Sequence, residues 1–208
     1  INLGNLNADN GATQKIVFSS ANEPGEGEHK ILNYIRESTE INKDDNIIIY
    51  GLDADLIMLA MSSQRENIYL LRESLLFNRV IEGKFLLLDI DYLKFGLIMT
   101  LKEHIFEYDS CYIIKDITRI IDDYIFICYF LGNDFLPHIP GISLKDDGHD
   151  LLLKIYISIL VNYGDYLIDR SKMRINNSFL FSFINKLANS EKELYQKFTN
   201  KRRRLRPS

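Results

Sequence analysis

Five carboxylates in three short segments are the residues of this 208-residue chain best suited to chemistry. Glu26 and Glu28 lie in PGEGEHKI, Asp53 and Asp55 in YGLDADLIML, and Asp134 in FLGNDFLPHIP. Ionised carboxylates that gather at the edge of an apolar core repel one another and lose hydration, which is costly unless a cation or hydrogen-bond donors compensate. The three segments therefore predict a buried divalent-metal site.

The ligands indicate which metal such a site would select. Oxygen ligands favour Mg²⁺ or Mn²⁺ over zinc, which usually recruits His or Cys, and no histidines here form a plausible ligand pair. Several carboxylates around two such ions, about 4 Å apart, are the arrangement that hydrolyses phosphodiesters. The alternative is that Glu26 is a solvated turn residue and Glu28 a helix-start acid, with Asp53 and Asp55 a turn and N-cap pair.

Strands are predicted just before both acid pairs. KIVFSS (15–20) is typical of a buried strand. The apolar run NIIIY (46–50), ended by Gly51, is typical of a strand buried on both faces of a parallel sheet, and IYLLRE (68–73) indicates another strand. Because the carboxyl ends of parallel strands meet at one edge of a sheet, the two acid pairs are expected to converge there.

Helices are predicted to follow these strands. One begins at Glu28 and presents Ile31, Leu32 and Ile35 on one face, and another covers 55–63, with Asp55 near its start. Residues 85–106 are expected to form a strand or turn followed by a helix. Further helices are expected over 117–132, 151–164 and 178–198. This alternation predicts an α/β fold with a mainly parallel sheet, followed by a helical C-terminal part.

The remaining acidic and aromatic residues have simpler expected roles. Asp122 and Asp123 are interpreted as a solvated helix face, although they resemble another metal pair. The aromatic residues of FICYF and FLFSF are expected to fill the core, although aromatics also stack on unpaired bases. His138 is expected to brace the loop that carries Asp134, whereas His104 and His149 are read as surface or packing residues.

Composition limits the classes of protein that fit. The chain is 46% hydrophobic with a formal net charge of −4, which suits a globular domain and argues against a uniformly basic nucleic-acid coat. Cys111 and Cys128 lack the spacing of a zinc site and are expected to be reduced thiols. The apolar runs are too short or too interrupted to span a bilayer, so a soluble protein is expected. No signal peptide is visible, and an intracellular location is expected, without a choice between cytoplasm and nucleus. The chain begins without Met, which suggests a fragment.

Four segments of the chain resemble consecutive signature segments of the XRN family of 5′→3′ exoribonucleases. They are PGEGEHKILNYIR, IYGLDADLIMLAMSS, IYLLRES and RIIDDYIFICYFLGNDFLPHIPGISL, in the family's order, and the resemblance spans about residues 15–195. It implies a PIN-like, flap-endonuclease-related domain that uses two Mg²⁺ or Mn²⁺ ions to remove nucleotides processively from single-stranded RNA bearing a 5′ monophosphate. It also implies that the catalytic and metal-binding acids are Glu26, Glu28, Asp53, Asp55 and Asp134.

The resemblance also implies how the chain is organised. Residues 1–145 would be the later part of the nuclease domain, and 146–208 a helical continuation with a basic end. The family's domain begins upstream with further metal-binding aspartates, a basic pocket for the 5′ phosphate and an aromatic stacking contact. The 208 residues alone are therefore expected to bind metal poorly and to be inactive, while the full gene product is expected to be catalytic.

Two other functions remain open on the sequence. One is a non-catalytic RNA-binding or scaffold module, and the other is a related DNA-acting 5′ flap nuclease. The GNDFLPHIPG stretch favours the exoribonuclease, because the DNA enzymes follow their aspartate with a helix-hairpin-helix. His29 and Lys30 could contact substrate phosphate or be structural, and KRRRLR (201–206) could bind RNA backbone, act as an import signal or be merely solvated.

Overall fold

The protein consists of two compact units, seen in a computed structural model. The model describes residues 2–7, 13–76, 79–108, 116–133, 136–137, 139, 142 and 147–204. Unit 1 comprises Ile1–Leu88 and unit 2 comprises Asp89–Ser208. Each unit is described by itself below.

Unit 1 begins with a two-stranded antiparallel sheet formed by β1 (Asn2–Asn7) and β2 (Thr13–Phe18). The strand predicted at 15–20 is therefore present, but the prediction that it is buried is wrong. Ile16 is 42% exposed and Phe18 58% exposed, because β2 pairs only with β1 and belongs to a sheet separate from the one that follows.

The second sheet of unit 1 has the order β3–β4–β5, with β3 at Ile47–Tyr50, β4 at Ile68–Leu76 and β5 at Arg79–Asp89. Strands β3 and β4 are parallel, as predicted, and β3 ends before Gly51. The prediction that β3 is buried on both faces is wrong. Ile49 is 3% exposed, whereas Ile48 is 62% and Tyr50 54% exposed, so only one face of the strand is covered in the described part.

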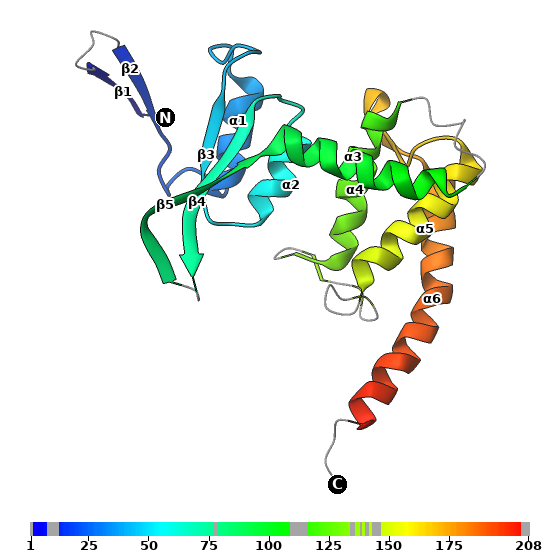
Figure 1. Ribbon diagram of the computed structural model, residues 1–208. Coiled ribbons are helices and arrows are strands. Elements are labelled where there is room, and N and C mark those ends of the chain that lie inside the picture. Colours follow the sequence, from blue (N-terminus) through cyan, green and yellow to red (C-terminus); the bar gives the residue numbers. More distant parts are fainter. Residues whose placement is uncertain are drawn as a thin grey trace. The chain divides into compact units, whose positions relative to one another are not determined.

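Helices α1 (Gly27–Glu37) and α2 (Asp55–Ser62) confirm the two predicted helices of unit 1. Helix α1 contacts α2, and α2 contacts β4 (Figure 1). Leu32 and Ile35 of α1 are buried, but Ile31 is 39% exposed, so the apolar face is narrower than predicted.

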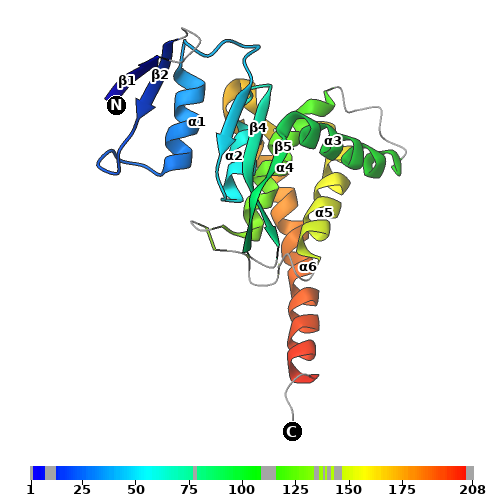
Figure 2. The ribbon, with the colours of Figure 1, turned by 60° about the vertical axis from the view of Figure 1, so that its left-hand side comes forward.

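Unit 2 is mainly helical. Its longer helices confirm the four predicted ones: α3 (Ile90–Phe106), α4 (Ile120–Cys128), α5 (Gly148–Tyr163) and α6 (Asn177–Arg204). Short 3₁₀ turns cover Ile117–Arg119, Tyr129–Leu131 and Arg170–Lys172, and β6 (Ile168–Asp169) pairs with β7 (Arg174–Ile175). Figures 1 and 2 both show α6 running beside α5 and continuing past it.

Glycine ends two of these helical segments. Gly132 follows the turn after α4 with φ +83°, and Gly164 follows α5 with φ +74°, values that side chains with a Cβ rarely adopt. None of the helices in the described ranges is both long enough and apolar enough to cross a membrane.

The aromatic side chains of FICYF and FLFSF fill the core only in part. Phe179 and Phe183 are fully buried, and the Phe183 ring lies 5.4 Å from that of Phe130. Phe181 of FLFSF and Tyr129 of FICYF are exposed, at 69% and 37%. Cys128 is a free thiol whose pKa is raised to about 11 by burial, while Cys111 lies outside the described residues.

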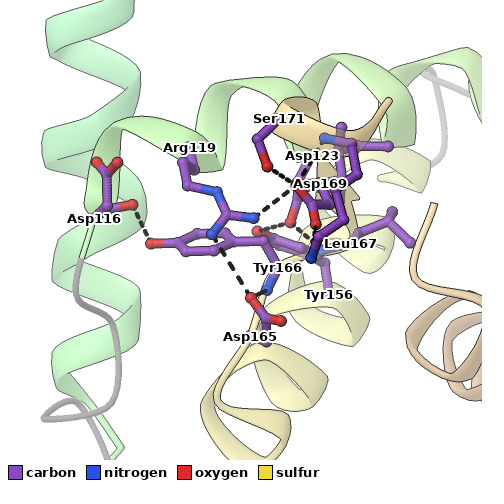
Figure 3. Close-up of polar contacts among 11 residues, drawn as sticks. Asp116, Arg119, Asp123, Tyr156, Asp165, Tyr166, Leu167, Asp169 and Ser171 are labelled. Carbon is purple, nitrogen blue, oxygen red and sulfur yellow. Dashed lines mark hydrogen bonds and ion pairs between the residues drawn. The ribbon is translucent and has the colours of Figure 1, made fainter. Parts of the chain in front are cut away.

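Asp123 overturns the interpretation of Asp122 and Asp123 as a solvated helix face. The Asp123 side chain is fully buried and accepts three hydrogen bonds, from the Tyr156 hydroxyl at 2.8 Å and from the amides of Leu167 at 2.8 Å and Ile168 at 2.7 Å (Figure 3). Burial raises its pKa to about 6 although these donors act in the opposite direction. Asp122 is also largely covered, with its side chain 13% exposed, and pairs with Arg170.

A second set of contacts surrounds this buried carboxylate. Arg119 donates to the Ile168 carbonyl at 3.1 Å, and its guanidinium lies 4.4 Å from the centre of the Tyr166 ring. The Tyr166 hydroxyl donates to the backbone carbonyl of Asp116 (Figure 3). Together with Asp123, these contacts attach the segment between α5 and α6 to α4.

The structure is thus a mixed α/β fold with helices and a small sheet. The division into compact units falls between Leu88 and Asp89. That division reflects how the chain packs and does not test where the nuclease domain ends. The boundary between a nuclease domain and its helical continuation, at residues 145 and 146, therefore stays a prediction.

Candidate metal centre

Asp53 and Asp55 occupy the turn between β3 and α2. Strand β3 ends before Gly51, whose amide donates to the Leu71 carbonyl of β4 at 3.1 Å. Asp53 Oδ1 accepts from the Asp55 amide at 3.2 Å, and Asp55 is the first residue of α2. One Asp53 oxygen therefore stabilises the turn, which leaves its second oxygen for another role.

Gly51 lets α2 start close to the end of β3. A Cβ at this position would lie 2.3 Å from Cδ1 of Leu56, a buried side chain of α2. The Asp53 turn therefore depends on the absence of a side chain at residue 51.

Replacing Gly51 tests this packing. We expect Gly51→Ala to lower the free energy of unfolding by about 1–3 kcal/mol, because the new methyl must displace Leu56. Gly96→Ala is the matched control, since a Cβ there meets nothing within 4 Å and Gly96 lies inside α3. It should be neutral or stabilise by up to about 1 kcal/mol. Denaturant unfolding is measured for both variants, for Leu56→Ala and for the double variant Gly51→Ala/Leu56→Ala. If the losses of unfolding free energy in Gly51→Ala and Leu56→Ala simply add in the double variant, the two side chains do not meet.

Glu26 and Glu28 flank the start of α1. Glu26 is the N-cap residue, yet its side chain makes no capping hydrogen bond, and Glu28 lies in the first turn. Glu26, Glu28 and His29 each offer a ligand atom, and these three atoms all lie within 4.8 Å of one another. His29 Nε2 lies 3.9 Å from Glu26 Oε2. The sequence offers no histidine pair as ligands, and the structure adds this single histidine to the two glutamates.

The two acid pairs share one electrostatic environment. Partial burial raises the pKa of Glu28, and the charges of Asp53, Glu26 and Asp55 raise it further, whereas His29 acts in the opposite direction. The pairs meet because α1 packs against α2, and not because two strands of one sheet end together, since β2 lies in a different sheet. The expectation of deep burial is wrong for Glu26 and Asp53, which are exposed.

This geometry suits a hard divalent cation. A carboxylate whose pKa is raised by neighbouring carboxylates, as for Glu28, is stabilised by a shared positive ion, and oxygen ligands are those that Mg²⁺ and Mn²⁺ prefer. Glu28 and Asp55 are partly buried while Glu26 and Asp53 are exposed, so the cluster lies at the protein surface, where a substrate has access.

Asp134 and His138 lie outside the described residues. The described residues Asn133 and Leu136 are joined by two hydrogen bonds. The Asn133 amide donates to the Leu136 carbonyl at 2.9 Å, and the Leu136 amide donates to Asn133 Oδ1 at 2.7 Å. The metal-binding role of Asp134 stays a prediction.

Lys30 lies on α1 beside the acids. Its Nζ donates to the Ser20 carbonyl at 3.1 Å, so this ammonium closes the turn that precedes the helix. Arg72, Glu73 and Tyr50 at the neighbouring end of the sheet received no role from the sequence. The sequence feature that could have drawn attention to Arg72 and Glu73 is the IYLLRES segment in which they lie.

Two family models match this chain. The model described as the XRN 5′-3′ exonuclease N-terminus matches residues 5–74, which include Glu26, Glu28, Asp53 and Asp55. The model described as the Xrn1 helical domain matches residues 114–208. This chain belongs to the XRN family of 5′-3′ exoribonucleases. The resemblance stated from the four sequence segments is therefore confirmed.

Curated XRN proteins extend over much more sequence than this chain. It is 35% identical over 192 residues to 5′-3′ exoribonuclease 1 of Schizosaccharomyces pombe, covering 88% of this chain and 14% of the relative. It is 32% identical over 229 residues to 5′-3′ exoribonuclease 2 of Arabidopsis thaliana (92% and 22%) and 37% identical over 160 residues to that of Yarrowia lipolytica (74% and 16%). The chain thus spans about one-seventh to one-fifth of the length of these relatives.

Proposed function

We propose that this chain is part of a metal-dependent 5′→3′ exoribonuclease that degrades single-stranded RNA with a 5′ monophosphate to mononucleotides inside the cell. The observation that carries the proposal is the shared environment of Glu26, Glu28, Asp53 and Asp55 in a chain of the XRN family. Its relatives are named 5′-3′ exoribonucleases. The α/β arrangement of unit 1, with acids after a parallel strand, supports a PIN-like nuclease fold.

Each acid has a proposed task at two divalent ions. Glu28 and Asp55, which are partly buried, bind metal from the starts of α1 and α2. Glu26 supplies an exposed carboxylate that makes no capping hydrogen bond. Asp53 supplies its Oδ2, because its Oδ1 accepts from the Asp55 amide. Asp134 is included because it lies in the FLGNDFLPHIP motif, which resembles a signature segment of the family. Bound Mg²⁺ or Mn²⁺ would activate the attacking water and neutralise charge on the scissile phosphate.

The neighbouring residues have supporting tasks in this proposal. His29, beside Glu26, either binds metal or donates to a phosphate oxygen. Lys30 holds the turn before α1 and so fixes the direction in which Glu26 and Glu28 project. The predicted division at residues 145 and 146 would separate this nuclease region from a helical continuation.

Degradation of RNA with different 5′ ends tests the proposal. The full gene product is incubated with 5′-monophosphate, 5′-triphosphate and circular RNA of one sequence, in Mg²⁺ or in chelator. We expect Mg²⁺-dependent decay of the monophosphate RNA, much slower decay of the triphosphate RNA and an intact circle. The 208-residue chain alone should show little or no decay in the same assay.

Several results would contradict the proposal. Decay in chelator would exclude metal dependence, and cleavage of the circle would identify an endonuclease. Equal decay of the two linear RNAs would remove the monophosphate preference. Full activity of the 208-residue chain would show that these residues suffice for catalysis.

A further inference from the structure

Arg72 has a buried, charged donor that nothing in the described structure satisfies. Arg72 Nε and Glu73 Oε2 are the buried side-chain polar atoms that lack a hydrogen-bond partner among the described residues. An unpaired buried polar atom destabilises the fold, and does so more when the group is charged. Such an atom therefore indicates a ligand or partner.

Arg72 lies on β4 beside the carboxyl end of β3, the strand that leads to Asp53. In the parallel pairing of β3 with β4, Tyr50 is opposite Leu71, and the Gly51 amide donates to the Leu71 carbonyl. Arg72 is the next residue of β4, so it lies level with Gly51. From Gly51 the chain runs directly to Asp53.

The side chains of Arg72 and Glu73 point to opposite faces of the sheet. Because side chains alternate along a strand, Arg72 shares its face with Leu70, which is 8% exposed, on the covered side. Glu73 shares its face with Leu71 and Tyr50, and the Tyr50 hydroxyl donates to Glu73. This hydrogen bond is the main reason why the pKa of Glu73 is lowered.

Four other cations of unit 1 are already engaged. Lys30 donates to the Ser20 carbonyl, Arg36 to Ser62 Oγ at 3.4 Å, and Arg65 to the Ile41 carbonyl at 3.0 Å. Lys15 pairs with Glu40. Arg72 differs because the residue is partly buried and its buried Nε has no hydrogen-bond partner within the described part.

We propose that Arg72 binds a backbone phosphate of the RNA beside the carboxyl end of β3. A guanidinium presents a planar fork of donors that matches two phosphate oxygens, and a partly covered one is less hydrated and binds more strongly. Arg72 then satisfies its own donor and offsets the repulsion between the acidic cluster and the polyanion. This role rests on the proposed function and adds a substrate-binding residue to it.

RNA binding by the full gene product tests this role. Affinity for 5′-monophosphate RNA is measured over a range of salt concentrations, with Ca²⁺ replacing Mg²⁺ to suppress turnover. We expect Arg72→Gln to weaken binding about 10- to 100-fold and to lower the slope of log affinity against log salt by about 0.7, the value for one phosphate contact with a single strand. Arg72→Lys should restore the slope, because the charge returns, but only part of the affinity.

Glu73→Gln is the matched control, since it changes the neighbouring residue on the opposite face. It should keep the wild-type slope. An unchanged slope and affinity in Arg72→Gln would overturn the inference. So would a lower thermal midpoint with unchanged slope, which would show that Arg72 pairs with a carboxylate of the same polypeptide. Wild-type protein that fails to degrade RNA in Mg²⁺ would contradict the proposed function instead, so the two failures are distinguishable.

Discussion

Replacing both Asp53 and Asp55 by asparagine should lower the kcat of RNA degradation by the full gene product about 10³-fold or more. Each substitution removes a negative charge from the proposed metal centre, and the loss of one charge-stabilising group costs about 10²- to 10³-fold. Asparagine retains an oxygen that can accept from the Asp55 amide, so the turn after β3 should persist. The midpoint of thermal unfolding should therefore change little, while the Mg²⁺ concentration needed for half-maximal rate should rise.

Asp89→Asn is the control for a general effect of losing a helix-start acid. Asp89 precedes α3, and its Oδ1 accepts from the Tyr92 amide at 2.9 Å. This variant should keep the wild-type kcat and Mg²⁺ requirement. If it lost activity as Asp53→Asn/Asp55→Asn does, or if the double variant kept wild-type turnover, the two aspartates would be no more than structural caps.

Asp123→Ala should be among the most destabilising single substitutions in unit 2. It leaves the Tyr156 hydroxyl and the amides of Leu167 and Ile168 without their acceptor in a fully buried site. Unsatisfied buried donors and the cavity together should cost about 3–5 kcal/mol. Asp123→Asn should cost less, about 1–3 kcal/mol, because its amide nitrogen must still face one backbone donor.

Asp165→Ala is the matched control for Asp123. Asp165 lies 3.7 Å from Arg119, but its side chain is 61% exposed, so this ion pair should contribute less than about 1 kcal/mol. Denaturant unfolding of the 208-residue chain compares the variants. Equal losses in Asp123→Ala and Asp165→Ala would contradict a special role for the buried carboxylate.

The pH dependence of stability should carry the signature of Asp123. Its pKa is raised from 3.8 to about 6, so between these values the native state holds a proton that the unfolded state has released. This group therefore stabilises the fold most below pH 4, and the contribution, about 3 kcal/mol at most, is lost as pH rises through 6. Asp123→Asn should flatten this change relative to wild type; an identical pH profile would show that Asp123 does not titrate there.

The sequence predicted elements well and burial less well. Local patterns predicted a helix at 55–63 and strands at 46–50 and 68–73, because spacing and glycine positions act within a few residues. The structure has them at 55–62, 47–50 and 68–76. Burial depends on what covers a strand. The run NIIIY has the composition of a strand covered on both faces, yet Ile48 and Tyr50 are exposed in the described structure.

The candidate site shows the same limit. The motifs identify Glu26, Glu28, Asp53 and Asp55, but the sequence attributes their meeting to one sheet edge, whereas the α1–α2 contact brings them together. Asp123 is read as solvated although Ile120 and Ile127, three residues before and four after it, lie on its face of the helix. That spacing indicates that Asp123 is buried. The three donors to Asp123 could not be predicted in the same way, because they come from residues more than 30 positions away.

The most direct test of the metal-centre account follows the first nucleotide released from RNA by the full gene product. The RNA carries a label in its 5′-terminal monophosphate nucleotide, and Mg²⁺ is titrated for the wild type and for Glu28→Gln. The account predicts that labelled mononucleotide appears first, only in the presence of Mg²⁺, and that Glu28→Gln requires more Mg²⁺ and turns over more slowly. Release of the label within longer fragments, release in chelator, or an unchanged Mg²⁺ requirement in Glu28→Gln would contradict it.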